Sequence, residues 1–256
     1  MLRRAAVAAV LYALAALPVA AQTDVPSVDE ILKKHHDALG GEAKIKAIQS
    51  IKMTGKAVVG GGQMEAPMTM QQKRPGMMRM ELSFQGMSFI QAFDGTTAWM
   101  INPFQGGTEP QKSDEEQTKD AVEDADLDGV LMDYKAKGHS VELVGKEDVE
   151  GTAAYKLKVT KKSGKVDYQF LDAKTFLPLK TITRRKQMGQ ELEIEVLPSG
   201  FKPVNGVLMP HALEQKMGGR GMMQLTVDKI EVNVAIDDAQ FKMPVKKEEK
   251  PKEAKP

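Results

Sequence analysis

Few side chains in this sequence have the type and spacing that metal binding would need. Two of the four histidines, His35 and His36, are adjacent and are followed by Asp37. Successive side chains on a helix diverge by about 100°, so this pair does not converge on one ion. Only His139 and His211 remain to complete a tetrahedral set of ligands. No metal site is therefore predicted, and His35 and His36 are interpreted as structural residues.

Residue patterns typical of enzymes are also missing from the sequence. The chain has no cysteine, and no serine lies in a Gly-x-Ser-x-Gly turn. Residues 113–135 carry nine carboxylates, but their spacing matches no calcium-binding loop, so a solvated acidic face is expected. We predict no catalytic residue and no cofactor, and we do not expect an enzyme.

The chemistry that the sequence does favour is the binding of apolar groups. Nine of the 17 methionines lie within residues 51–101, together with three phenylalanines and the only tryptophan. Met and aromatic residues alternate there with polar ones, which places them on one face of a strand. Such a face is either ordinary core or the wall of a cavity, and the adaptable methionine side chain suits varied guests. The residues predicted to line the cavity are Met53, Met68, Met70, Met78, Met80, Leu82, Phe84, Phe89, Phe93 and Trp99.

The elements that would position these residues are mainly strands. Residues 51–101 predict five short strands, because turn-forming residues recur at 60–62, 74–76, 85–86 and 94–95. Residues 102–112 are predicted to be a loop. A second set of alternating segments runs from Val141 to Val234, which brings the total to about 11 strands. The fold class is therefore α+β and mainly β, with an antiparallel sheet large enough to curl into a barrel or half-barrel.

Two helical segments are predicted to cover this sheet. Ser27 is a plausible N-cap for a helix over residues 28–39, which Gly40 and Gly41 would end. Residues 113–135 begin with a capping-box pattern and are expected to be helical, with Asp126 and Gly129 as positions that could divide them into two helices. The apolar residues of this second segment fall on one narrow stripe, which predicts a lid. They are Leu127, Val130, Leu131 and Tyr134.

Residues 1–21 have the features of a secretory signal peptide. Arg3 and Arg4 precede an apolar run of about 13 residues, too short to span a bilayer comfortably, and cleavage is expected after Ala21. Because no cysteine follows that point, a lipoprotein is not expected. Residues 22–244 are predicted to form a single domain, and residues 245–256 a disordered charged tail. Without Arg3 and Arg4 the formal charge is −1, which argues against binding to nucleic acid.

Four stretches resemble a known group of exported proteins. They are VDEILKKHHDALGGEAKIKAIQSIKMTGKAVV from Val28, YKLKVTKKSGKVDYQFLDAKTFLPLKTIT from Tyr155, VNGVLMPHALEQK from Val204 and LTVDKIEVNVAIDDAQFKMP from Leu225. In the order of their elements they are similar to the LolA/LolB-like superfamily, the outer membrane lipoprotein-sorting proteins. The resemblance implies a periplasmic protein with an unclosed barrel, lidded by helices, around an apolar cavity that holds acyl chains.

The sequence departs from that superfamily in two ways. Without a lipobox cysteine it does not match an anchored LolB-type receptor. No local motif allows the cavity arginine of LolA to be assigned here. Arg79 lies opposite the face of Met78 and Met80, and Arg184 and Arg185 lie in a basic run, so none of them receives that role.

The resemblance favours a monomeric periplasmic carrier or binding protein for the acyl chains of lipids or lipoproteins. A membrane or an envelope protein would then act as donor and acceptor of the cargo. A periplasmic sensor of the same fold, similar to RseB-type regulators, is the alternative. Such a regulator normally has a second domain, whereas only a short Lys, Glu and Pro tail follows Pro244, which favours the carrier.

Overall fold

The structure, a computed structural model of the chain, describes residues 25–187 and 190–245. The predicted signal peptide and all of the predicted tail after Val245 lie outside these ranges. The first half contains α1 (Val28–Leu39), α2 (Glu42–Lys46), β1 (Ser50–Val59), β2 (Met64–Lys73), β3 (Met77–Phe84), β4 (Met87–Phe93), β5 (Ala98–Asn102), the 3-10 helix η1 (Pro103–Gln105), β6 (Gly107–Lys112) and α3 (Glu115–Asp124). The second half contains β7 (Ser140–Val149), β8 (Thr152–Thr160), β9 (Val166–Asp172), β10 (Pro178–Gln187), β11 (Gln190–Ser199), β12 (Lys202–Val204), β13 (Val207–Met209), β14 (Ala212–Met217), β15 (Arg220–Val232) and the 3-10 helix η2 (Asp238–Gln240).

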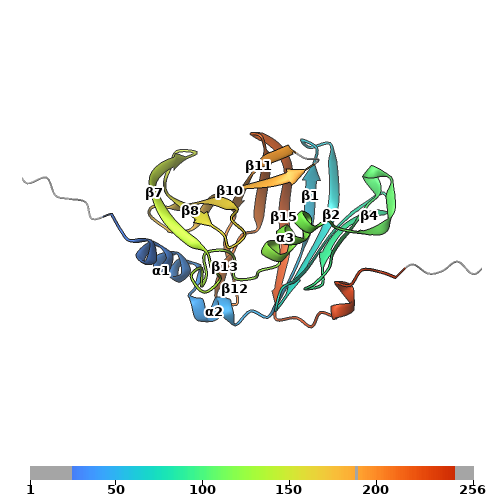
Figure 1. Cartoon of the computed structure of the whole chain (residues 1–256), viewed down its shortest axis with the longest axis horizontal. Helices are drawn as coiled ribbons and strands as arrows, with labels where there is room; N and C mark the ends of the chain where they lie inside the picture. The colour runs from blue at the N-terminus through green and yellow to red at the C-terminus, as the bar shows by residue number, and fades with distance from the viewer. Residues whose placement is uncertain (1–24, 188–189, 246–256) are drawn as a thin grey trace, which may run out of the picture.

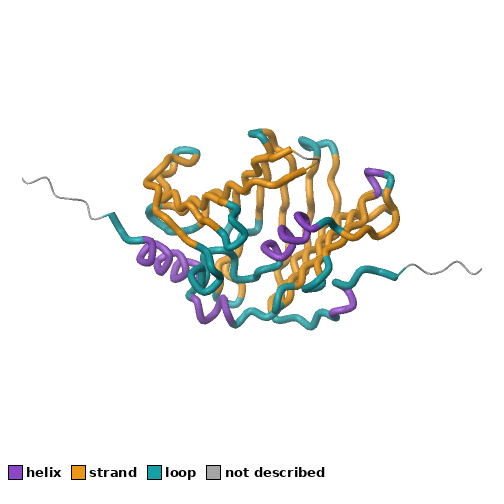
Figure 2. Tube along the Cα trace, viewed as in Figure 1, coloured by secondary structure: helices purple, strands orange, loops and turns teal. Residues whose placement is uncertain are grey.

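Thirteen strands of the described residues form one antiparallel sheet. Its order is β6-β5-β4-β3-β2-β1-β15-β14-β11-β10-β9-β8-β7, and β12 and β13 form a separate small sheet. The sheet curls, but its edge strands β6 and β7 do not pair, so it does not close into a barrel (Figure 1). Strands dominate the chain and the few helices lie against the curved sheet (Figure 2). The predicted fold class and the unclosed barrel are confirmed, with 13 strands rather than about 11 in the main sheet.

The strands β1 to β5 form the meander predicted for residues 51–101. They pair in sequence order, and β1 also pairs with β15, which joins the two halves of the chain in the middle of the sheet. The β1–β15 register shifts between Thr54 and Gly55. A Cβ atom at Gly55 would lie 2.0 Å from the Thr226 carbonyl oxygen, so only glycine fits this close approach of two strands.

The first helix has the predicted boundaries and caps. Ser27 and Glu30 form a capping box at the start of α1, and Gly40 ends the helix in the left-handed conformation with φ of 119°. A Cβ atom at Gly40 would lie 2.2 Å from the Gly206 carbonyl oxygen, between β12 and β13. The absence of a side chain at Gly40 therefore lets the end of α1 contact the small sheet.

Two predicted segments differ from the structure. The expected loop at 102–112 contains η1 and the edge strand β6, whose Pro110 is tolerated because an edge strand leaves some N–H positions unpaired. The expected helix over 113–135 is helical only in α3, which Asp114 rather than Ser113 caps. Residues 126–138 form turns instead. Asp126 accepts a hydrogen bond from the Asp128 backbone N–H, and Gly129 and Asp133 have positive φ, so the helix cannot continue there.

The two faces of the sheet are covered by different parts of the chain. We call the inner face the one that carries α1, α3 and the lid loop, residues 125–138. Ala121 of α3 packs on Met78 and Phe93 there, and Leu131 of the lid loop lies in a cluster with Leu157 of β8. We call the opposite side the outer face. The segment 234–244 packs on it through Phe241, which is fully buried.

Candidate ligand-binding site

An apolar cavity of about 360 Å³ lies on the inner face, between the sheet, the lid loop, the first two helices and the small sheet. This volume lies within the range of small-molecule binding pockets. The apolar residues that line it are Leu39, Ile45, Ile48, Ile51, Met53, Leu127, Val130, Leu131, Met132, Leu171, Pro178, Val207, Met209 and Pro210. The polar side chains in its wall are His35, His36, Asp128 and Gln169. The arrangement can hold an apolar group, and it offers only a few polar contacts.

Most of the predicted cavity residues lie together on the inner face. Met53 lines the cavity itself. Five others pack in the same cluster as Met53, where β1, β2, β3 and β4 continue from the cavity wall; they are Met68, Met70, Leu82, Phe84 and Phe89. Met80 lies opposite Met70 in the register and so shares this face. Met78 and Phe93 are also on the inner face, but they are covered by Ala121 of α3 and by Ala125, the first residue of the lid loop.

Trp99 lies on the outer face, and its assignment to the cavity wall is wrong. Trp99 pairs with Ala92 of β4, and Ala92 pairs with Arg79 of β3. Arg79 lies between Met78 and Met80 in β3, so Arg79, Ala92 and Trp99 lie on the opposite face of the sheet. The Trp99 Nε1–H donates a hydrogen bond of 2.7 Å to the Phe241 carbonyl oxygen. The composition of residues 51–101 could not reveal this placement, because the aromatic residues of one strand segment belong to both faces.

The lid loop contributes the predicted apolar residues, although it is not helical. Leu127, Val130 and Leu131 line the cavity. Tyr134 packs against the neighbouring cluster that includes Ile31 of α1, and its hydroxyl donates a hydrogen bond of 3.0 Å to Asp29. The predicted stripe therefore faces the sheet, with Tyr134 at the side of α1 rather than in the cavity.

Ion pairs hold the lid loop over the cavity. Both terminal nitrogens of Arg74 lie 2.6 Å from the Asp128 carboxylate, and Arg74 Nε also donates to the Ile48 carbonyl oxygen. The hydrogen bonds from Arg74 lower the pKa of Asp128, against the opposing effect of burial. Lys46 of α2 pairs with Asp133 at 2.8 Å. These contacts connect the lid loop to α2 and to the turn between β2 and β3.

Part of the acidic side of α3 is paired with the second half of the sheet. This corrects the expectation of a solvated acidic face for Asp120 and Glu123, whereas Asp114 and Glu115 are exposed as expected. Glu123 lies 2.6 Å from Lys161, and Lys161 is also 2.7 Å from Asp167 of β9. Asp120 lies 2.7 Å from Lys165 and 3.2 Å from Arg185. Because Ala121 packs on the first half, α3 connects both halves across the inner face (Figure 1).

The adjacent histidines differ in their contacts. The Nδ1 atom of His35 lies 2.8 Å from the Phe176 carbonyl oxygen, and burial lowers the pKa of His35 to about 4. The Nδ1 atom of His36 lies 3.1 Å from Glu42 Oε1, and its Nε2 atom is buried without a hydrogen-bond partner. The contacts of His35 are consistent with its predicted structural role. His36 differs, because one of its ring nitrogens makes no hydrogen bond.

The second half of the chain supplies a part of the inner face that the sequence patterns did not identify. Thr181 pairs with both Gln169 and Val196, so Val196 shares the inner face with the cavity residue Gln169. The same register places further half-buried apolar residues on this face; they are Leu192, Ile194, Met217, Met223 and Leu225. The alternation of Leu192, Ile194 and Val196 with glutamates indicates that this strand has one apolar face. The sequence does not indicate that this face is the inner one.

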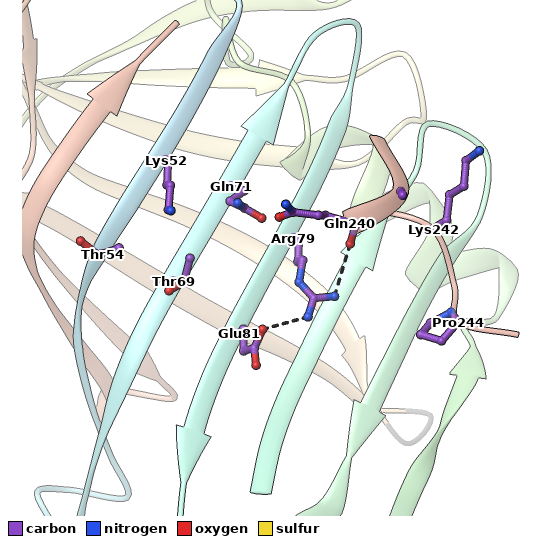
Figure 3. A pocket seen from close by; sticks show the side chains of 10 residues that line it. Lys52, Thr54, Thr69, Gln71, Arg79, Glu81, Gln240, Lys242 and Pro244 are labelled. Carbon is purple, nitrogen blue, oxygen red and sulfur yellow. Dashed lines mark hydrogen bonds and ion pairs between the residues drawn. The ribbon is translucent and has the colours of Figure 1, made fainter. Parts of the chain in front are cut away.

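A second hollow, of about 440 Å³, lies on the outer face, and its lining is polar. Figure 3 shows Arg79 pointing toward Glu81 and Gln240, where η2 crosses the strands. Lys52, Thr69 and Gln71 lie on the neighbouring strands. With charged and amide groups along its floor, this hollow is unsuited to an acyl chain. The inner cavity is therefore the better candidate for an apolar ligand.

In residues 25–187 and 190–245, no group of three His, Asp or Glu residues is arranged to hold a metal ion. Within the same ranges, no helix is both long and apolar enough to cross a membrane.

No family model matches the sequence, and no curated protein matches it. Solved structures do match its fold. A domain assigned to outer membrane lipoprotein sorting, from Vibrio parahaemolyticus, has a TM-score of 0.58 at 12% identity, covering 83% of this chain and 96% of that one. A DUF1329 family protein from Desulfovibrio piger has a TM-score of 0.58 at 14% identity, with coverage of 84% and 97%. A LolA superfamily protein from Nitrosomonas europaea has a TM-score of 0.56 at 12% identity, with coverage of 85% and 98%. The chain thus has a LolA-like fold, as the sequence resemblance indicated.

Proposed function

We propose that this protein binds the acyl chain of a lipid or lipoprotein in the inner cavity and carries it through the periplasm. The observation that supports this most is the cavity of about 360 Å³ with largely apolar walls, which the lid loop lines on one side. The likeness in fold to a domain assigned to outer membrane lipoprotein sorting supports the same function. The function needs no catalytic group, so we propose a binding protein rather than an enzyme.

The energetics of burial suit such a carrier. Removing an acyl chain of about 15 carbons from water gains on the order of 10 kcal/mol before ordering costs, at roughly 0.8 kcal/mol per methylene. Met53, Met132 and Met209 of the cavity wall are unbranched and can change rotamer to fit different chains. A longer chain could extend from the cavity along the neighbouring inner-face residues Met70, Leu82 and Phe89.

Release of the cargo would require a receiving membrane or protein. The lid loop is tied down by the ion pairs Arg74–Asp128 and Lys46–Asp133, so opening the cavity breaks charged contacts and exposes apolar surface. Both changes are unfavourable in water. A receptor that covers the exposed chain would offset this cost, which makes a donor and an acceptor of the cargo part of the proposal.

Adjacent residues of β1 provide a matched test. Met53 lines the inner cavity and Thr54 lines the outer hollow. Met53→Glu should weaken binding of a pyrene-labelled fatty alcohol at least about tenfold, because a carboxylate in an apolar wall must be desolvated. Thr54→Glu should leave binding within about twofold of the unchanged protein.

The comparison requires that both variants fold, which thermal unfolding would establish. Native mass spectrometry of protein purified without detergent should in addition show co-purifying lipid. If the unchanged protein carries no lipid and binds no fatty alcohol, the carrier function is wrong. If Thr54→Glu weakens binding as much as Met53→Glu, the inner cavity is not the site.

A further inference from the structure

One polar atom in the wall of the inner cavity makes no hydrogen bond. His36 is 6% exposed, and its Nε2 atom is buried without a hydrogen-bond partner. Among the described residues, only Asn102 Oδ1 shares this condition. The His36 ring forms part of the cavity wall. Asn102 is the last residue of β5 and does not line the cavity. A buried polar atom without a partner is energetically unfavourable, and a ligand that formed a hydrogen bond with it would remove this cost.

The contact on the other side of the ring determines what Nε2 can bind. His36 Nδ1 lies 3.1 Å from the Glu42 carboxylate, which only accepts hydrogen bonds when ionised. In the neutral ring the single proton therefore lies on Nδ1, where it is donated to Glu42. This leaves a lone pair on Nε2, so Nε2 is an acceptor directed to a donor that the protein does not supply.

We infer that His36 is the polar contact for the ligand's head group and selects acyl chains whose head carries a hydroxyl or amide N–H donor. The inference rests on the proposed function and specifies its ligand. A head group of this kind would satisfy Nε2, while the attached chain occupies the apolar part of the cavity. An ester or hydrocarbon without a donor would leave Nε2 unsatisfied and would bind less tightly.

The surroundings of His36 permit such a contact. Protein atoms cover Nε2 in this arrangement, so a head group reaches it only after side chains of the wall move. Met132 and Met209 lie in the same wall, and the flexible methionine side chain can move without disturbing the backbone. Asp128 is held by Arg74, so it already has its partner on the lid loop.

The test compares two ligands with the same chain. Monopalmitoylglycerol carries hydroxyl donors, and methyl palmitate carries none. At pH 8, the unchanged protein should bind monopalmitoylglycerol about tenfold more tightly than methyl palmitate, measured by displacement of the pyrene-labelled fatty alcohol; this ratio corresponds to about 1.4 kcal/mol. His36→Phe should reduce the ratio to about one, and His36→Gln, which keeps an acceptor oxygen, should restore part of it.

The control is His139→Gln, because His139 lies outside the cavity wall and accepts a hydrogen bond from the Lys162 backbone N–H. This change should leave the preference intact. The unchanged protein gives a second measurement that does not depend on folding of variants. The ¹⁵N chemical shift of His36 Nε2 should move when monopalmitoylglycerol is added, and not when methyl palmitate is added. Equal binding of both ligands, or no shift, would overturn the role of His36 while leaving the carrier intact. Failure of every acyl ligand to bind would overturn both.

Discussion

At the scale of single residues, His35 illustrates how the fold fixes the charge of a side chain. It is 6% exposed, and its Nδ1 atom contacts the Phe176 carbonyl oxygen. Desolvation lowers its pKa to about 4, below the ordinary value of about 6.5. The unfolded chain therefore binds a proton at His35 in a pH range where the folded chain does not. This difference couples folding stability to pH.

The free energy of unfolding should decrease as the pH falls from about 6.5 to 4, because protonation of His35 favours the unfolded state. A depression of this size corresponds to at most about 3 kcal/mol. His35→Gln keeps a donor for the Phe176 carbonyl oxygen but cannot titrate, so its stability should change less over this range. Urea unfolding at pH 8, 6.5, 5 and 4 would measure the difference. Parallel pH profiles for the two proteins would contradict the neutral, buried state of His35.

At the scale of elements, α3 is held by opposite chemistry on its two sides. Ala121, together with Ala125 directly after the helix, packs on the apolar inner face of the first half. Asp120 and Glu123 pair with basic residues of the second half. Lys161 is central to the charged side, because it is 5% exposed at its side chain and contacts both Glu123 and Asp167. Buried charges of this kind depend on each other.

Lys161→Met should destabilise the protein by about 3 to 5 kcal/mol, since it leaves Glu123 and Asp167 without their cation. Denaturant unfolding would measure the loss. Lys119→Met is the matched control, because Lys119 lies on α3 itself and pairs with Glu115 at the exposed surface. That change should alter stability by less than about 0.5 kcal/mol. Similar losses for the two variants would show that the charged side of α3 does not hold the helix.

At the scale of the whole molecule, the two faces of the sheet have separate roles. The inner face carries the cavity, and the outer face carries the segment 234–244. Phe241 is fully buried there beside Met77 and Ile236, and its carbonyl oxygen accepts the hydrogen bond from Trp99. This segment therefore stabilises the sheet from the side opposite to the proposed ligand.

Phe241→Ala should lower the free energy of unfolding by about 3 to 5 kcal/mol through loss of a buried aromatic side chain. It should leave the affinity for the pyrene-labelled fatty alcohol unchanged under conditions where the variant is folded. Lys242→Ala, at the exposed neighbouring position, should change neither quantity measurably. A loss of ligand affinity in folded Phe241→Ala would show that the two faces are coupled.

The local patterns of the sequence predicted the elements well, because caps and turns depend on near neighbours. Ser27 and Gly40 bound α1 as predicted, and the turns between β1 and β5 fall at the predicted positions. Placement across the fold was harder to predict. The alternation of side chains along a strand shows that Trp99 and Met80 lie on opposite faces of the sheet only when the strand register is known. Likewise, the ion pairs of Asp120 join residues far apart in the sequence, which no local pattern records.

The location of a bound chain is the most direct test of the proposed function. A fatty alcohol with a diazirine in its chain can be crosslinked to the protein by light, and the modified peptides identified by mass spectrometry. We expect saturable labelling of the cavity wall, at Met53, Leu131 or Met209. Labelling confined to the outer hollow at Thr69 or Gln71, or labelling that does not saturate, would contradict an acyl site on the inner face.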